Sequence, residues 1–164
     1  MSLAEFKEGF KEEYQGEVIG EVFFDGLLKR FDSPQHRYKL ATLLQLETET
    51  KARLRPTALE LGLELAELDE YRKLGHDFVE SCEGMDWKGV MAYLGPLVET
   101  YVNKFAGIAE VAPPEYKDVA DSMIVHETAI LTFANLEASG DTEHSLDDVI
   151  KQLKFPMKLR SRKA

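Results

Sequence analysis

The sequence predicts an all-α protein in which four long helices form an antiparallel bundle. Apolar residues recur at three- and four-residue steps through long segments, as they do on one face of a helix. No segment shows the convincing alternation of apolar and polar residues that is typical of a strand. Residues that stop and restart helices, such as Asp32-Ser33-Pro34, separate the segments. With 164 residues, the chain is long enough for one domain with a sizeable core.

The first two segments are predicted to form a helical hairpin. Ser2 and Glu5 make a capping-box pattern at the start of the first helix, which we expect to end near Phe31. Ser33 is a favourable N-cap for the second helix, with Pro34 at its first position, and this helix should run towards Leu61. The short turn between the two helices makes them antiparallel.

The rest of the chain is predicted to form a connection, a second hairpin and a short last helix. Capping residues, glycine or proline bound these helical segments: 63–83, 87–110, 113–139 and 146–153. The first of them is a polar connection, the next two form the second hairpin, and Ser145 caps the last. We therefore expect one bundle domain over residues 1–155, followed by a basic tail over residues 156–164.

Glutamates interrupt the apolar stripes of the long helices. Glu127 lies in line with Met123 and Ala134 on the stripe of its helix. A carboxylate on a core-facing stripe costs free energy unless something pairs with it. Similar mid-helix positions on or beside a buried face are occupied by Glu17, Glu21, Glu47, Glu99 and Glu127.

Four of these glutamates are placed symmetrically about the two hairpin turns. Glu17 lies as far before Asp32 in sequence as Glu47 lies after it. Glu99 and Glu127 are likewise equally distant from Pro113, where the second turn is expected. Residues equally far from the turn of an antiparallel hairpin lie at the same height, so each hairpin should present a pair of carboxylates to a shared centre.

On these glutamates and their spacing, residues 3–140 resemble the ferritin-like superfamily, in particular its rubrerythrin-type di-iron carboxylate bundles. In that family one helix of each hairpin gives a single Glu and the other gives Glu-x-x-His. The resemblance implies that Glu17 and Glu99 correspond to the single glutamates. It implies that Glu47 and Glu127 correspond to the first residues of the two Glu-x-x-His motifs.

The sequence departs from the family at both histidines. Thr50 and Ile130 occupy the positions where the motif has His. His126 is also a candidate ligand, but it precedes Glu127 and should point about 100° away around the helix, which makes it a poor substitute. Glu21, one turn beyond Glu17, is an additional candidate ligand. A site made of carboxylates would suit Fe, Mn or Mg better than Zn or Cu.

Three interpretations follow from this pattern. In the first, the bundle holds a dinuclear Fe or Mn site for oxygen or peroxide chemistry or for metal handling, and would be an oxidoreductase if it is an enzyme. In the second, the bundle is degenerate, binds no metal and acts as a binding or scaffolding protein. Its carboxylates would then be protonated, hydrated or paired with Lys51, Arg53 or Lys104.

In the third interpretation, a small apolar or acyl ligand binds between the helices. Glycines in the first helix and prolines inside the second and fourth segments would open room for it. Tyr14, Tyr93 and Tyr101 are candidates to line such a cavity.

Composition and charge limit the classes of partner. All 30 acidic residues lie within residues 1–150, and this acidic body disfavours nucleic-acid binding. The segment from Lys151 to Ala164 is rich in Lys and Arg, and the sequence identifies no partner for it. With Cys82 as its only cysteine, no signal pattern and no apolar run long enough to span a bilayer, the protein is predicted to be cytoplasmic. Phe23 and Phe24 make the first helix apolar on more than one side, which suggests a homodimer.

Overall fold

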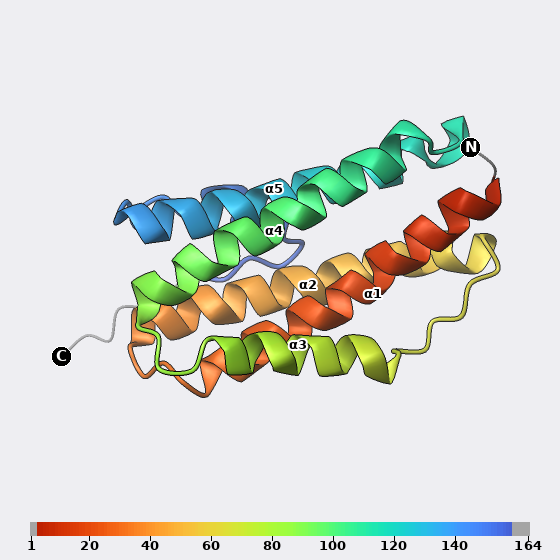
Figure 1. Ribbon diagram of the computed structural model, residues 1–164. Helices are drawn as coiled ribbons and strands as arrows, with labels where there is room; N and C mark the ends of the chain where they lie inside the picture. The colour runs from red at the N-terminus through yellow and green to blue at the C-terminus, as the bar shows by residue number, and fades with distance from the viewer. Residues whose placement is uncertain (1–2, 159–164) are drawn as a thin grey trace.

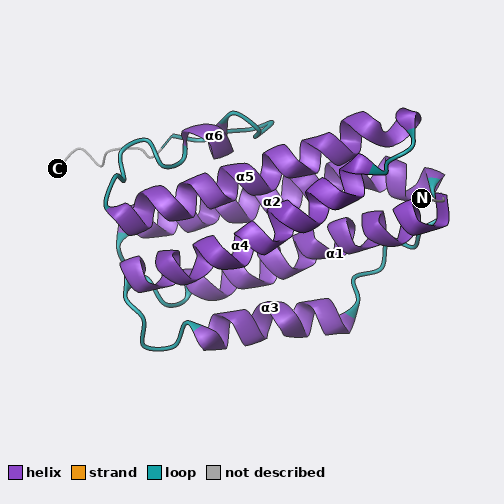
Figure 2. Cartoon of the chain, turned by 45° about the horizontal axis from the view of Figure 1, so that its top comes forward, coloured by secondary structure: helices purple, strands orange, loops and turns teal. Residues whose placement is uncertain are grey.

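The computed structural model describes residues 3–158, and every regular element in that range is helical. The elements are α1 (Leu3–Leu28), α2 (Pro34–Glu60), α3 (Asp69–Ser81), α4 (Trp87–Glu110), a short 3-10 helix η1 (Pro114–Tyr116), α5 (Lys117–Ser139) and α6 (Asp147–Ile150). Figure 2 shows helices and loops alone. The all-α prediction is confirmed.

The four long helices form two hairpins. α1 packs against α2, and α4 packs against α5. Figure 1 shows the second hairpin lying alongside the first, with α3 along the outer side of α1. Gly140 adopts φ 92° at the end of α5, a left-handed conformation that glycine tolerates, and so ends the helix where the sequence predicts. No helix in the described range has the length and apolar character needed to cross a bilayer.

The apolar core is divided into two clusters along the bundle. One contains Phe24, Leu43 and Met91 near one end of the hairpins. The other contains Phe10 and Phe105 near the opposite end. The middle of the bundle, between these clusters, holds buried ionisable side chains, which is where the glutamate spacing predicts them.

Residues 63–68, the segment before α3, form a non-helical strap that side chains of α1 hold in place. Gln15 is buried; its Nε2 donates to the carbonyl of Ala66 at 2.9 Å and its Oε1 accepts from the amide of Leu68 at 3.1 Å. The Tyr14 hydroxyl donates to the carbonyl of Leu65 at 3.2 Å. The prediction of helix from residue 63 is therefore wrong over this strap: the helix begins only at Asp69, and α1 supplies hydrogen bonds that a helix would have made internally.

α3 covers the second apolar side of α1. A Cβ on Gly75 would lie 2.9 Å from the carbonyl oxygen of Ile19, and a Cβ on Gly26 would lie 2.6 Å from Val79. These glycines let the two helices approach closely. Phe23 and Phe24, the basis of the homodimer prediction, are 3% and 2% exposed within the single chain. Their burial against the chain itself accounts for the apolar pattern without a second copy.

The last helix is shorter than predicted, because it spans only Asp147–Ile150. α6 has Leu146 rather than Ser145 at its N-cap position, and no side chain caps it. Ser145 is buried and donates its hydroxyl to the carboxylate of Glu137 instead. Beyond α6 the chain lies against α2, because Tyr38 donates to the carbonyl of Met157. Of the predicted basic tail, residues 159–164 lie outside the described range.

Candidate metal centre

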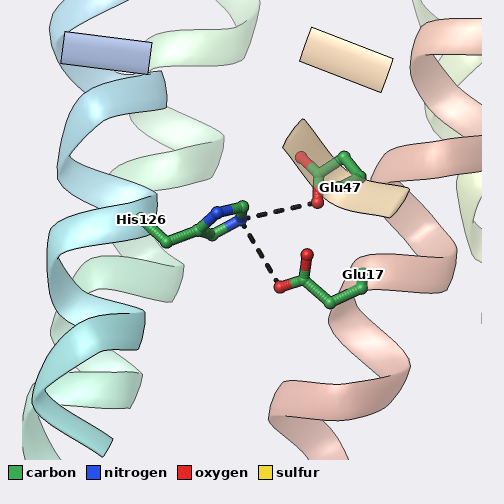
Figure 3. Close-up of side chains that lie close together, drawn as sticks. All are labelled: Glu17, Glu47 and His126. Atoms are coloured by element: carbon green, nitrogen blue, oxygen red, sulfur yellow. Dashed lines mark ion pairs between the residues drawn. The ribbon is translucent and has the colours of Figure 1, made fainter. Parts of the chain in front are cut away.

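Three buried side chains from three helices meet in the middle of the bundle. Glu17 of α1, Glu47 of α2 and His126 of α5 are 1%, 4% and 0% exposed. His126 Nε2 lies 3.4 Å from Oε1 of Glu17 and 3.5 Å from Oε2 of Glu47 (Figure 3). One ligand atom from each residue lies within 4.8 Å of the other two. The three donors therefore surround a single point.

Glu17 and Glu47 reach this point because they lie at the same height in the first hairpin. Their separation from the turn is equal in sequence, and their carboxylates come together as the spacing predicts. Gly20 makes the approach close: a Cβ on Gly20 would lie 2.4 Å from Cδ of Glu47. The carboxylate of Glu47 thus rests against the backbone of α1.

Thr50 contacts the outer nitrogen of the His126 ring. Thr50 Oγ1 lies 3.2 Å from Nδ1, and both groups are buried. When Nδ1 carries the proton and donates to Thr50, Nε2 presents its lone pair to the two carboxylates. Among the described residues, neither Nε2 nor Oε2 of Glu17 has a hydrogen-bond partner. These are buried polar atoms for which the described residues provide no partner of their own.

Glu13 and Glu127 add two carboxylates to the same region. Glu13 is 0% exposed, and neither of its carboxylate oxygens has a hydrogen-bond partner within the described part of the chain. Burial and then the charge of Glu127 raise the pKa of Glu13 to about 8, although Arg53 acts in the opposite direction. Burial also raises the pKa of Glu127 to about 8, opposed by His126 and reinforced by Glu47.

The same electrostatics act on the converging residues. Burial and the neighbouring charge of Glu47 hold the pKa of Glu17 well above its usual range. Burial disfavours the charged form of His126, but the charge of Glu47 and then of Glu127 outweighs it, so the pKa of His126 is raised. The region thus retains protons at neutral pH, or else takes up another cation in their place.

Comparison with protein-family models, with curated proteins and with solved structures gave no match to this chain.

Among the predicted site residues, Glu17, Glu47 and His126 form the cluster, and Glu127 lies beside it. The charge of Glu127 raises the pKa of His126, and the charge of Glu47 raises the pKa of Glu127. The expectation that His126 points away from the centre is wrong. The buried stripe of α5 includes both His126 and Glu127, and a stripe wider than about 100° accommodates two neighbouring residues.

Glu99 and Glu21 lie elsewhere. Glu99 is exposed, because the buried face of α4 ends at its neighbour Val98. Glu21 accepts hydrogen bonds from Thr48 at 2.7 Å and from Lys51. The symmetric spacing therefore places a carboxylate pair correctly in the first hairpin and only one carboxylate in the second.

The cations considered as partners for the carboxylates are mostly engaged away from the cluster. Lys51 pairs with Glu21 and Glu67, and Lys104 pairs with Glu12. Arg53 is the exception. It donates to Ser122 at 2.6 Å, and its charge still opposes the rise in the pKa of both Glu13 and Glu17. One cation at the edge does not by itself compensate the carboxylates, which leaves that role to protons or to another cation.

Glu13 is the site residue that the sequence interpretation missed. It lies three residues after Phe10 and four before Glu17, so the same stripe passes through it. Tyr14, the adjacent aromatic residue, fits the same spacing, since it lies four residues after Phe10 and three before Glu17. Both are buried, because α3 and its strap cover α1 on a second side.

Proposed function

We propose that this protein binds a divalent metal ion, Fe or Mn, through Glu17, Glu47 and His126, in a bundle of the ferritin-like type. The observation that carries the proposal is the buried Nε2 of His126, which faces two carboxylate oxygens and has no hydrogen-bond partner among the described residues. A buried polar atom without a partner is costly. A metal ion at the shared point would satisfy it.

The geometry suits an ion. Metal–ligand bonds of about 2.1 Å separate neighbouring ligand atoms by about 3.0 Å in an octahedral site and about 3.4 Å in a tetrahedral one. The distances of 3.4 and 3.5 Å from His126 Nε2 to the two carboxylate oxygens are close to the separation of ligand atoms in a tetrahedral site. Small side-chain rotations would bring them to the octahedral value. One imidazole with carboxylates is a ligand set that suits Fe or Mn.

The charge of the region supports the same proposal and extends it to a second ion. Glu13, Glu17, Glu47 and Glu127 are all buried and would together carry four negative charges. Two divalent ions would offset that charge, with Glu13 and Glu127 as the carboxylates available to the second. A pair of ions of this kind would supply oxygen or peroxide chemistry or metal handling. Thr50 would hold the His126 ring in the tautomer that binds the ion.

Metal titration of the purified, metal-free protein tests the proposal. We expect one to two equivalents of Mn²⁺ or Fe²⁺ per chain, measured by calorimetry and confirmed by elemental analysis. His126→Ala and Glu17→Gln should each weaken binding by about 10-fold or more, since each removes a ligand. Glu99→Gln is the matched control, because Glu99 is an exposed glutamate on the same bundle. Equal affinity for His126→Ala and the parent would contradict the proposed site.

The alternative is a metal-free bundle with a binding or scaffolding role. The raised pKa values of Glu13 and Glu127, both about 8, favour it, because protonation removes part of the buried charge without any ion. The two proposals differ in the effect of Glu47→Leu. A metal-free scaffold should become more stable on losing this buried carboxylate, and a metal protein should lose its ion.

A further inference from the structure

A pocket of about 50 Å³ lies against the carboxylates on the side of α1, α3 and α4. Its α1 wall consists of Ile19, Phe23 and Phe24 together with Gly16 and Gly20, which contribute no side chains to fill it. Phe78 of α3 and Leu97 of α4, both half-buried, line it where the bundle meets solvent. The pocket extends inward to residues of the metal centre region and of α5: Glu47, Glu127 and Ile130.

The size of the pocket limits what it can hold. A cavity of about 150 Å³ accommodates benzene or xenon in an apolar protein core. At about 50 Å³ this pocket has room for two or three non-hydrogen atoms. An acyl chain or an aromatic ring, either of which the third sequence interpretation would allow, is too large for the pocket in this structure.

The lining limits the charge of an occupant. Apart from Glu47, Glu127 and Tyr101, every residue that lines the pocket is apolar or glycine. An anion would meet the two carboxylates, and burial raises the pKa of the Tyr101 hydroxyl to about 12, so this group stays neutral. A hydrated cation would have to lose water against the aromatic and aliphatic wall. Uncharged, weakly polar molecules meet neither obstacle.

We propose that this pocket admits small uncharged apolar molecules, of two or three non-hydrogen atoms and no larger, to the Glu47 and Glu127 side of the metal centre. α3 contributes to the size limit, since Phe78 is one of the residues that line the pocket. The selectivity is a property of the polypeptide alone. Its use rests on the proposed function: dioxygen belongs to this class and is a molecule that a bound Fe or Mn centre would consume.

Xenon and benzene test the pocket in the metal-free protein. We expect ¹²⁹Xe NMR to show saturable binding, and a crystal under xenon pressure to place the atom among Gly20, Tyr101 and Ile130. Leu97→Trp should abolish binding by filling the pocket. Leu131→Trp is the matched control, because Leu131 is a half-buried leucine on α5 that does not line the pocket. Thermal melts identify any variant that has lost its fold.

The size limit is tested with Phe78→Ala. Benzene should not bind the parent protein and should bind Phe78→Ala, in which the pocket gains the space of the removed ring. Absence of xenon from the parent, or equal xenon binding by Leu97→Trp, would overturn the proposal, and so would saturable benzene binding by the parent. Because these experiments contain no metal, they are independent of the metal titration, and either can fail without the other.

Discussion

At the residue scale, Thr50 and His126 lie in contact beside the two buried carboxylates of the first hairpin. Thr50 occupies the position three residues after Glu47, where a Glu-x-x-His motif would have its histidine. The structure brings a histidine to that place from the opposite hairpin, with Thr50 bonded to its Nδ1. In the proposed site the imidazole would therefore come from across the bundle, and Thr50 would orient it.

Thr50→Val should weaken metal binding without removing a ligand. Loss of a hydrogen bond to the outer nitrogen of a metal-binding histidine typically reduces affinity by about 10- to 100-fold. Thr42→Val is the control, because Thr42 is a buried threonine on the same helix whose hydroxyl donates to the carbonyl of Tyr38 at 2.8 Å. Calorimetric titration of both variants checks the prediction, and equal losses in the two would contradict a positioning role for Thr50.

Gly20→Ala should displace the Glu47 carboxylate while the protein stays folded. The added Cβ would meet the flexible end of the Glu47 side chain, which can rotate away. We expect metal affinity to fall by about 10-fold or more. In Gly16→Ala the Cβ would lie 3.5 Å from Phe105, an ordinary contact, and this variant should keep its affinity and gain about 0.5–1 kcal/mol from helix propensity. Titrations and thermal melts separate the two; unchanged affinity in Gly20→Ala would be evidence against Glu47 as a ligand.

A site residue can be predicted from the sequence when it places a charged group on a buried helix face, because burying that charge is costly. Glu17, Glu47 and Glu127 are predictable because each interrupts an apolar stripe, and all three are buried. The predictions for His126 and Glu99 fail for one reason: the width of a buried stripe depends on how many neighbours cover the helix. α5 buries two adjacent residues at the centre, whereas α4 turns Glu99 to solvent.

At the element scale, a second buried polar network joins α2, α4 and α5 near the end of the bundle. Lys39 is 5% exposed; its ammonium pairs with Glu137 and donates to the carbonyl of Thr142 at 2.8 Å. The other oxygen of Glu137 accepts from Nε1 of Trp87 at 2.7 Å. Ser145, predicted to cap a helix, belongs to this network instead.

Lys39→Ala should destabilise the fold by about 3–5 kcal/mol, because it leaves the buried carboxylate of Glu137 without its cation. The double variant Lys39→Met with Glu137→Leu should recover most of the loss, since no unpaired charge is left. Lys29→Ala is the control: its ion pair with Asp25 is exposed and should contribute little. Urea unfolding measures all three. A small loss in Lys39→Ala would show that the network is not a major source of stability.

The order and type of the long helices were predictable, and the covering segments were not. Capping residues and periodic apolar positions define α1, α2, α4 and α5 locally. The strap at 63–68 depends instead on Gln15, which belongs to a different helix and is distant in sequence. A contact of that kind leaves no periodic signal, and the prediction of helix there failed for this reason.

At the scale of the whole molecule, the buried carboxylates couple stability to pH. The pKa of both Glu13 and Glu127 is raised from 4.5 to about 8 in the folded chain. Between these values the folded protein binds more protons than the unfolded chain. The free energy of unfolding of the metal-free protein should therefore fall as pH rises, by up to about 1.4 kcal/mol per pH unit for each group.

We expect the metal-free protein to melt at a higher temperature at about pH 5.5 than at about pH 8. The variant with Glu13→Gln and Glu127→Gln should show a flatter dependence, because these groups no longer titrate. Added Mn²⁺ should reverse the trend, since protons compete with the ion for the ligands. Scanning calorimetry at several pH values measures each case. A metal-free melting temperature that rises with pH across this interval would contradict the prediction.

The three converging side chains also fix when the site can exist during synthesis. Glu17 and Glu47 belong to the first hairpin and His126 to the last long helix. Translation at about 5–20 residues per second leaves about 4–16 s between the appearance of Glu47 and that of His126. During this interval the nascent chain carries the two carboxylates at one height but lacks His126, the third member of the cluster. The proposed ion site would therefore be complete only after α5 has left the ribosome and docked.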